Sequence, residues 1–263
     1  MVLAAIPFGV GIGLSLGLLG GGGSVLAVPV VVYILGQNVH QATSVSLVVV
    51  TAAALVGGVR HARDGHVCWR HALAFTAAAV PGAFVGTALG QAVSGSTLIA
   101  AFALIMFAAA GAMWRKAIAG ARAGASDTPA ASCPPVRLAC GLAAGSLIGL
   151  MTGFFGVGGG FLIVPTLTLA LAFAMRPAVG TSLAIITATS VIALAAHLAA
   201  GRTLDLSVTI AMIAPVIAGA LAGGHLARRL PQRLLGTGFA TFVVLVGAYL
   251  LVSTTVLGGP PGG

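Results

Sequence analysis

The sequence has very few charged side chains. Lys and Arg supply 12 of its 263 residues and Asp and Glu supply 3, so 6% of the chain is charged, against about a quarter in soluble globular domains. Hydrophobic residues make up 59% of the chain, and the mean hydropathy is +1.15. This composition excludes a soluble globular protein and predicts an integral membrane protein. The net charge of +9 then indicates topology, because the cations lie between apolar runs, and no nucleic-acid partner is expected.

Acidic residues are almost absent. Asp64, Asp127 and Asp205 all fall in expected loops, so no carboxylate is available inside the membrane to coordinate Na⁺ or to form a conventional proton relay. This favours an anionic substrate over a cation.

Cysteine is also scarce. Cys68, Cys133 and Cys140 have neither metal-site nor redox spacing, and we interpret them as small apolar filler or ordinary loop thiols. The histidines have no flanking carboxylate of the kind that a zinc site or a nucleophilic triad uses. We therefore expect no metal, no cofactor and no enzymatic activity. The N-terminus lacks the basic region and cleavage site of a signal peptide and is expected to begin a retained span.

A glycine cluster occurs twice. The first copy runs from Gly17 through Gly20-Gly-Gly-Gly-Ser24 to Pro29, and the second runs from Gly153 through Gly156-Val-Gly-Gly-Gly160 to Pro165. The offset is constant, because 153−17, 156−20 and 165−29 all give 136. Further pairs recur in the same order: Thr43-Ser44 as Thr181-Ser182, and His61-x-x-x-Gly65 as His197-x-x-x-Gly201. The chain is therefore an internal duplication, which is typical of membrane transporters.

The apolar segments predict an all-α polytopic membrane protein with two homologous halves. Residues 1–114 form the first membrane repeat, 115–137 a flexible cytoplasmic linker and 138–263 the second repeat. The expected segments lie near 3–19, 24–35, 41–59, 71–90 and 96–114, and near 138–155, 160–175, 178–200, 206–227 and 234–252. They correspond to about eight to ten membrane segments. Two spacings, Gly86-x-x-x-Gly90 and Gly219-x-x-x-Gly223, predict close helix packing.

The segment 24–35 is too short to cross a bilayer of about 30 Å as a helix. Each glycine cluster therefore either breaks one discontinuous span or turns a re-entrant hairpin. With hairpins the halves are inverted, and every basic residue except Arg202 is cytoplasmic, a split of 11 to 1 among the 12 cations. With single crossings the halves are parallel and the split is 8 to 4, because Arg202 moves inside and four cations move outside. The positive-inside rule favours inverted repeats with both termini outside.

The glycine clusters are the main candidate site. Backbone that leaves a helix within the membrane must be buried in protein or line a polar cavity. Ser24 and Gly160 begin the following half-helices, where unpaired N–H groups and the helix dipole favour an anion. We expect two such starts to face each other around one small anion. The predicted substrate-binding residues are Gly20, Gly21, Gly22, Gly23, Ser24, Thr43, Ser44, Gly156, Gly158, Gly159, Gly160, Thr181 and Ser182.

The repeated polar residues have more than one interpretation. The two Thr-Ser pairs could cap their helices, bond to backbone or donate hydrogen bonds to a ligand. His61 and His197 could gate the pathway or relay protons, or they could simply end their helices with an interfacial imidazole.

The glycine clusters with their prolines, the Thr-Ser pairs and the His-x-x-x-Gly spacings resemble the sulfite exporter TauE/SafE family over all of the chain except the linker and the tail after Ser253. This resemblance implies a bacterial or archaeal inner-membrane permease for small sulfur-containing anions such as sulfite, thiosulfate or an organosulfonate. It also implies that the glycine clusters and Thr-Ser pairs line the central site. Because Val157 and Gly160 stand where the first copy has Gly21 and Ser24, the two half-sites differ chemically.

The leading hypothesis is thus a transporter, with a small anion and the lipid bilayer as partners. The main alternative is a non-transporting membrane accessory or assembly factor, and an intramembrane enzyme is a distant third. The substrate, the direction of transport, the coupling ion and the oligomeric state stay open, a homodimer being one option.

Overall fold

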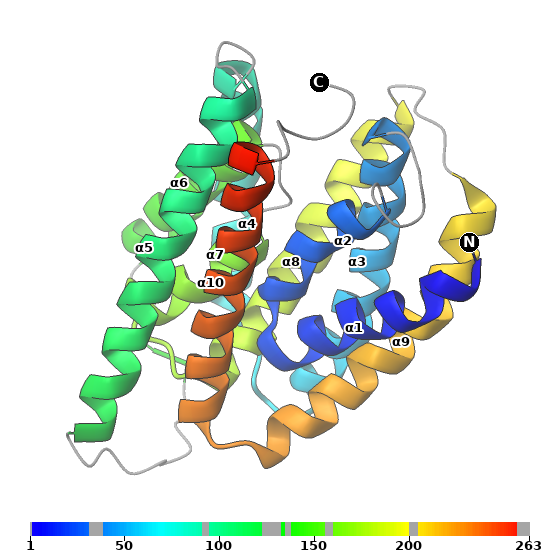
Figure 1. The fold of residues 1–263 in the computed structure, drawn as a ribbon. Coiled ribbons are helices and arrows are strands. Elements are labelled where there is room, and N and C mark those ends of the chain that lie inside the picture. The colour runs from blue at the N-terminus through cyan, green and yellow to red at the C-terminus, as the bar shows by residue number, and fades with distance from the viewer. Residues whose placement is uncertain are drawn as a thin grey trace.

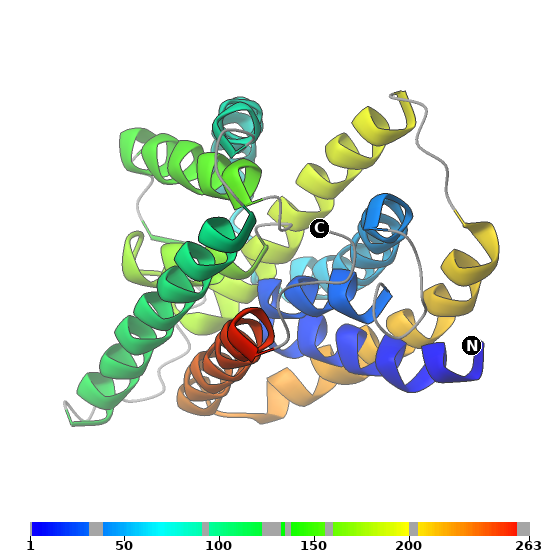
Figure 2. The same ribbon diagram turned by 45° about the horizontal axis from the view of Figure 1, so that its top comes forward.

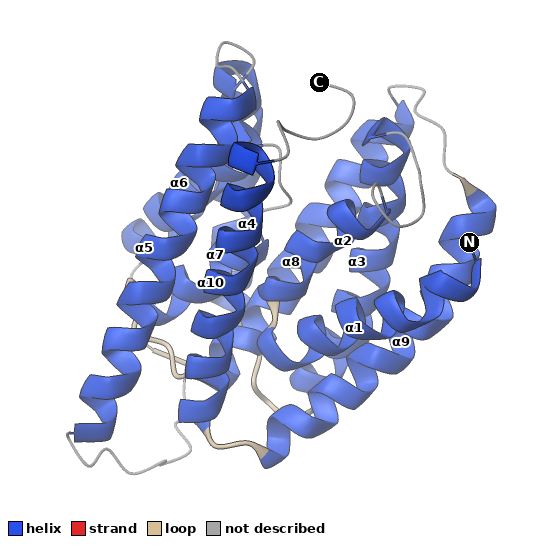
Figure 3. Ribbon diagram, viewed as in Figure 1, coloured by secondary structure: helices blue, strands red, loops and turns tan. Residues whose placement is uncertain are grey.

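The protein is helical throughout the part that the structure describes. The computed structural model describes residues 2–31, 39–90, 95–122, 133–134, 138–155, 160–199 and 205–256, and none of these residues forms a strand (Figure 3). The elements of the first half are α1 (Val2–Leu19), η1 (Gly21–Gly23), α2 (Ser24–Pro29), α3 (Val39–Arg63), α4 (Trp69–Gly90) and α5 (Gly95–Arg122). Those of the second half are α6 (Leu138–Phe155), α7 (Gly160–Leu169), α8 (Met175–Ala199), α9 (Leu206–Arg229) and α10 (Gln232–Val256).

Several helices are apolar enough for a membrane. Within the described residues, 3 helices have both the length and the hydropathy of a full crossing: Ser44–Arg63, Met175–Ala195 and Leu206–Arg229. Four shorter apolar stretches accompany them: Ile6–Leu19, Ala139–Phe154, Gly160–Leu169 and Leu234–Tyr249. Many large apolar side chains on the outside, such as Leu73, Phe84 and Leu104, are exposed, as lipid contact requires.

The first glycine cluster reverses the chain. Gly20 has a φ of +71°, a left-handed conformation that glycine adopts without the cost of a Cβ. After it the chain folds back on α1, because a Cβ on Gly23 would lie 2.7 Å from both the carbonyl oxygen of Ile12 and the amide nitrogen of Leu16. The predicted helix starts at Ser24 and Gly160 are confirmed as the first residues of α2 and α7.

Helices of one half pack against helices of the other. The first helix of each half packs along the fourth helix of the other: α1 along α9, and α6 along α4 (Figures 1 and 2). Glycine allows these contacts, since a Cβ at Gly219 or Gly223 of α9 would overlap carbonyl oxygens of α1. A Cβ at Gly86 of α4 would likewise overlap the carbonyl oxygen of Leu150 in α6. The prediction of close packing at these three glycines is confirmed.

Two further cross-half pairs join equivalent helices. Helix α3 packs on α8, and α5 packs on α10 (Figure 1). Near the end of α3, Gly57 and His61 approach Leu183 and Gly180, which lie near the start of α8. Helices α3 and α8 therefore run in opposite directions, as the colour gradient in Figure 1 also shows.

The described basic residues gather at one end of the bundle. They lie at the ends of α3, α5 and α9 and at the starts of α4, α8 and α10, which form the lower side of Figure 1. Hydrogen bonds and an ion pair connect part of this end, since Arg176 donates to the carbonyl oxygen of Arg228 and Arg228 pairs with Asp64. We call this end the basic face.

Two expectations fail near the linker. Residues 115–122, predicted as the first part of a flexible linker, continue α5 to Arg122. Cys68 and Cys133, expected to be filler or free thiols, form a disulfide with a Cα–Cα distance of 5.7 Å, and only Cys140 of the three is free.

Candidate functional site

The two glycine motifs meet in the interior. A Cβ on Gly21 would overlap the carbonyl oxygen of Gly160, so the two main chains touch without an intervening side chain. A Cβ on Gly160 would lie 2.6 Å from Oγ of Ser24 and 3.2 Å from the carbonyl oxygen of Gly21. Three residues predicted to bind one anion are thus in contact across the repeats. We call this place the glycine junction.

Ser182 completes the glycine junction from α8. A Cβ on Gly20 would lie 2.5 Å from Oγ of Ser182 and 3.4 Å from Cα of Val179. Ser182 is fully buried, and its hydroxyl donates to the carbonyl oxygen of Val179 over 2.8 Å. The Ser24 hydroxyl donates in the same way to the carbonyl oxygen of Gly21 over 2.7 Å. Both hydroxyls therefore bond to the backbone three residues earlier.

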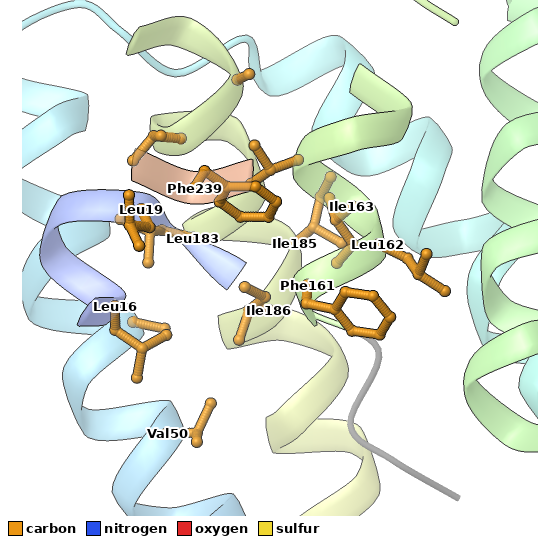
Figure 4. Close-up of a cluster of buried hydrophobic side chains, with 14 of the residues drawn as sticks. Leu16, Leu19, Val50, Phe161, Leu162, Ile163, Leu183, Ile185, Ile186 and Phe239 are labelled. Carbon is orange, nitrogen blue, oxygen red and sulfur yellow. The ribbon is translucent and has the colours of Figure 1, made fainter. Parts of the chain in front are cut away.

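Apolar side chains from both halves surround the glycine junction. Figure 4 shows Leu16 and Leu19 of α1 on one side and Phe161 of α7 on the other. Leu183, Ile185 and Ile186 of α8 and Phe239 of α10 lie around them (Figure 4), and all of these side chains are buried. Such a shell excludes water and strengthens any polar interaction inside it.

The other predicted residues of the first cluster face neighbouring helices. A Cβ on Gly22 would lie 3.4 Å from the rings of Phe239 and Phe242, so this residue is directed toward α10, whereas Gly23 lies on α1. Ser44 is fully buried in α3. Gly156, Gly158 and Gly159 lie outside the described residues, as do the side chains of Thr43 and His197.

Thr181 has a structural partner. Its Oγ1 accepts a hydrogen bond of 3.1 Å from the backbone N–H of Cys68. This bond fastens the loop between α3 and α4 to the start of α8, one residue before Ser182. Nothing in the sequence indicated it, because the two residues are 113 positions apart.

His61 is a buried imidazole with no hydrogen-bond partner. Only 5% of the residue is exposed, and neither Nδ1 nor Nε2 is bonded. Its ring centroid lies 6.1 Å from that of His66, and a Cβ on Gly180 would lie 3.0 Å from Cβ of His61. Gly180 adjoins Val179 of the glycine junction, so the imidazole is separated from the junction by the first turns of α8.

Charged groups of the basic face lie beside His61. Arg228 forms an ion pair of 3.2 Å with Asp64, and Arg60 approaches Nδ1 of His225 at 3.5 Å. Arg176 donates to the carbonyl oxygens of Arg228 and Leu230. Among the described residues of this face, cations outnumber the single carboxylate, Asp64, which favours the approach of an anion. Among the described residues no group of three or more His, Cys, Asp or Glu side chains could hold a metal ion.

Comparison with known proteins assigns the chain to a family. The family model described as "Sulfite exporter TauE/SafE" matches residues 5–250. The chain belongs to the sulfite exporter TauE/SafE family. The match includes both glycine clusters and every residue of the glycine junction.

Relatives of this TauE/SafE protein carry transporter names. A "Probable membrane transporter protein" of Xylella fastidiosa (strain 9a5c) is 36% identical over 247 residues, covering 91% of each chain. "Probable membrane transporter protein YunE" of Bacillus subtilis (strain 168) is 23% identical over 250 residues, covering 89% of this chain and 91% of its own. No solved structure matches the chain. This TauE/SafE protein is therefore a multi-pass membrane transporter of the plasma membrane.

Proposed function

We propose that this transporter is a permease for a small sulfur-containing oxyanion of the sulfite class, and that both halves share one site at the glycine junction. The observation that carries the proposal is the contact of Gly21 with Gly160, with Ser24 and Ser182 beside it. Two copies of a motif that lay 136 residues apart in sequence converge on one point, which two independent pores would not require.

The ion is held without a buried cation or metal. The first-turn N–H groups of α7, which begins at Gly160, have no partner within the helix and favour negative charge. The hydroxyls of Ser24 and Ser182 turn from the carbonyls of Gly21 and Val179 to donate to the oxyanion. The other predicted residues of the glycine clusters and Thr-Ser pairs complete the site from both repeats.

The glycine junction is also the barrier to ion flow in this conformation. Because the main chains of Gly21 and Gly160 touch, an oxyanion passes only when the two repeats separate there. His61, between the basic face and the start of α8, gates the pathway on that side, and His197 has the equivalent role in the other repeat.

The two halves are inverted repeats, residues 1–114 and 138–263, joined by a cytoplasmic linker. The opposite directions of α3 and α8 support this arrangement, since equivalent helices of inverted repeats run antiparallel. The basic face is then cytoplasmic under the positive-inside rule, and both termini lie outside. Alternating access follows from movement of one repeat against the other.

Export needs no coupling ion. An inside-negative potential of about 100 mV supplies roughly 2.3 kcal/mol for each negative charge that leaves the cell. A divalent oxyanion gains about twice that free energy, so a uniporter at the glycine junction suffices for export.

A reversible lock across the glycine junction tests the proposal. Ser24→Cys and Gly160→Cys are combined in a background in which Cys68, Cys133 and Cys140 are Ser, because position 160 approaches Oγ of Ser24 at 2.6 Å. The purified protein is oxidised, freed of oxidant and placed in liposomes loaded with radiolabelled sulfite. Because sulfite itself cleaves disulfides, maleimide labelling after the assay checks that the cross-link has survived. We expect oxidation to reduce efflux to the rate of protein-free liposomes and reductant to return it to the rate of the unoxidised double variant, which lies below wild type because both replaced residues belong to the proposed site.

The two single-cysteine variants are the matched controls and should not respond to oxidant. If the cross-linked protein still releases sulfite, the shared pathway is wrong. If the reduced and the wild-type proteins both carry no sulfite, no thiosulfate and no organosulfonate, the alternative of a non-transporting accessory factor is favoured.

A further inference from the structure

The transport proposal leaves the disulfide between Cys68 and Cys133 without a role. The two residues are separated by 65 positions, and their Cα atoms lie 5.7 Å apart. Cys68 belongs to the loop between α3 and α4, and Cys133 precedes α6. The bond therefore links the first repeat to the residues just before the second. Cys140 is exposed and free.

The disulfide lies on the basic face. Cys68 follows the end of α3 at Arg63 and precedes Arg70 at the start of α4. This face is cytoplasmic in the proposed topology, and cytosolic disulfides are rare and mostly transient, with catalytic or sensing roles. A bond here is therefore expected to be opened and closed during the life of the protein.

The two cysteines differ in their exposure. Cys68 is 3% exposed, whereas Cys133 is an exposed residue. Arg63 and Arg70, which flank the loop of Cys68, are exposed too. A nucleophilic anion is thus attracted to this face by charge and reaches the sulfur of Cys133 rather than that of Cys68.

We propose that this disulfide is a covalent modification site for sulfite, with Cys133 as the modified residue. The inference rests on the proposed function in one respect, namely that the transported ion is present at the cytoplasmic face. Sulfite and thiols share the lone pair on sulfur that cleaves disulfides, whereas sulfate has no such lone pair.

The reaction is balanced without an oxidant or a reductant. The sulfur lone pair of SO₃²⁻ attacks Sγ of Cys133, a new S–S bond forms, and the bond to Cys68 breaks with its electron pair on Cys68. The products are an S-sulfonate on Cys133 with one negative charge and a thiolate on Cys68, which takes a proton from water. When sulfite leaves the cell, the Cys68 thiolate attacks the S-sulfonate of Cys133, expels SO₃²⁻ and restores the disulfide.

The modification bears on the glycine junction through one hydrogen bond. The N–H of Cys68 donates to Thr181, and the next residue, Ser182, touches Gly20. Cleavage removes a covalent constraint from the loop that holds the start of α8. The site therefore reports the cytoplasmic sulfite concentration to the transport pathway.

Mass spectrometry of the full-length protein tests this inference. The protein, purified in detergent without reductant, is treated with sulfite or with sulfate and then with N-ethylmaleimide. We expect sulfite alone to add the mass of one SO₃ group to the Cys133 peptide and to make Cys68 reactive to maleimide. Removal of sulfite before the maleimide step should return both peptides to the disulfide. Cys140→Ser should behave as wild type, whereas Cys68→Ser and Cys133→Ser should gain no SO₃.

Thermal unfolding gives a second readout, because the bond closes a long loop and stabilises the fold. Sulfite should lower the unfolding temperature of wild type but not that of Cys133→Ser. The inference is overturned if SO₃ appears on Cys68, if the disulfide survives sulfite that cleaves oxidised glutathione, or if both thiols are free before treatment. Since no transport is measured, a sulfonated protein that carries no sulfite would contradict only the proposed function.

Discussion

Gly21 is the residue at which the two repeats come closest, and no side chain fits there. Replacement by Ala places a methyl group on the carbonyl oxygen of Gly160, so the main chains must separate and the packing strain costs about 1 to 3 kcal/mol. We expect Gly21→Ala to abolish sulfite flux in liposomes and to lower the unfolding temperature.

Two other glycines distinguish a specific effect of Gly21→Ala from general destabilisation. Gly86→Ala also overlaps a carbonyl oxygen, that of Leu150, away from the glycine junction, whereas Gly11→Ala meets nothing within 4 Å. Gly86→Ala should lose stability but keep flux, and Gly11→Ala should keep both. Normal flux in Gly21→Ala would contradict the shared site.

His61 combines an energetic cost with a location on the pathway. A buried polar group without a partner costs about 1 to 3 kcal/mol, and neither ring nitrogen of His61 is bonded. Met has a similar volume and no such cost. We therefore expect His61→Met to raise the unfolding temperature. It should also lower sulfite flux, because the variant lacks the imidazole that we propose operates the gate.

The exposed His225 provides the matched control for His61. His225→Met should change the free energy of unfolding by no more than about 0.5 kcal/mol. A less stable His61→Met protein would show that the imidazole contributes to folding, and unchanged flux would remove it from the pathway.

At the scale of elements, the pairing of α1 with α9 depends on glycines that bring backbones into contact. A Cβ at Gly17 would overlap the carbonyl oxygen of Ala220, and the larger Val side chain cannot be accommodated by rotation. We expect Gly17→Val to separate α1 from α9 and to reduce the yield of folded protein measured by size-exclusion chromatography. Gly141→Val, in α6 with nothing within 4 Å, brings the same gain in helix propensity and should remain folded.

The sequence predicted those elements that local pattern determines. The helix starts at Ser24 and Gly160 follow from glycine clusters, and the close packing at Gly219 and Gly223 follows from their spacing. The end of α5 was placed too early, at the charges of Arg115 and Lys116. The next residues, Ala-Ile-Ala-Gly-Ala up to Arg122, are mostly good helix formers, and their propensity extends the helix past the apolar run.

Long-range contacts around the site could not be predicted from the sequence. The disulfide of Cys68 with Cys133 and the bond from Cys68 to Thr181 depend on how helices are arranged in space, which spacing along the chain does not encode. The repeat predicted that the two glycine clusters share a site. It could not predict that Gly21, rather than Gly22, faces the second cluster, because that depends on the turn after Gly20.

At the scale of the whole molecule, the distribution of charge predicts the orientation in the membrane. With the basic face inside, the linker around Ser126 is cytoplasmic. We expect Ser126→Cys, in a background with Cys68, Cys133 and Cys140 replaced by Ser, to resist an impermeant maleimide added to intact cells. The same residue should react once the membrane is permeabilised. Labelling in intact cells would reverse the proposed topology.

The packing of helices from one half on helices of the other also sets the order in which the protein can assemble. Helix α1 leaves the ribosome long before its partner α9, which begins at residue 206. At about 5 to 20 residues per second, α1 waits roughly 10 to 40 seconds for that partner. During this interval its glycine-rich face, Gly13 and Gly17, lacks the α9 backbone on which it packs in the folded protein. The native pairing of α1 thus forms only late in translation, and a chain truncated before α9 leaves this face available to membrane quality-control proteases.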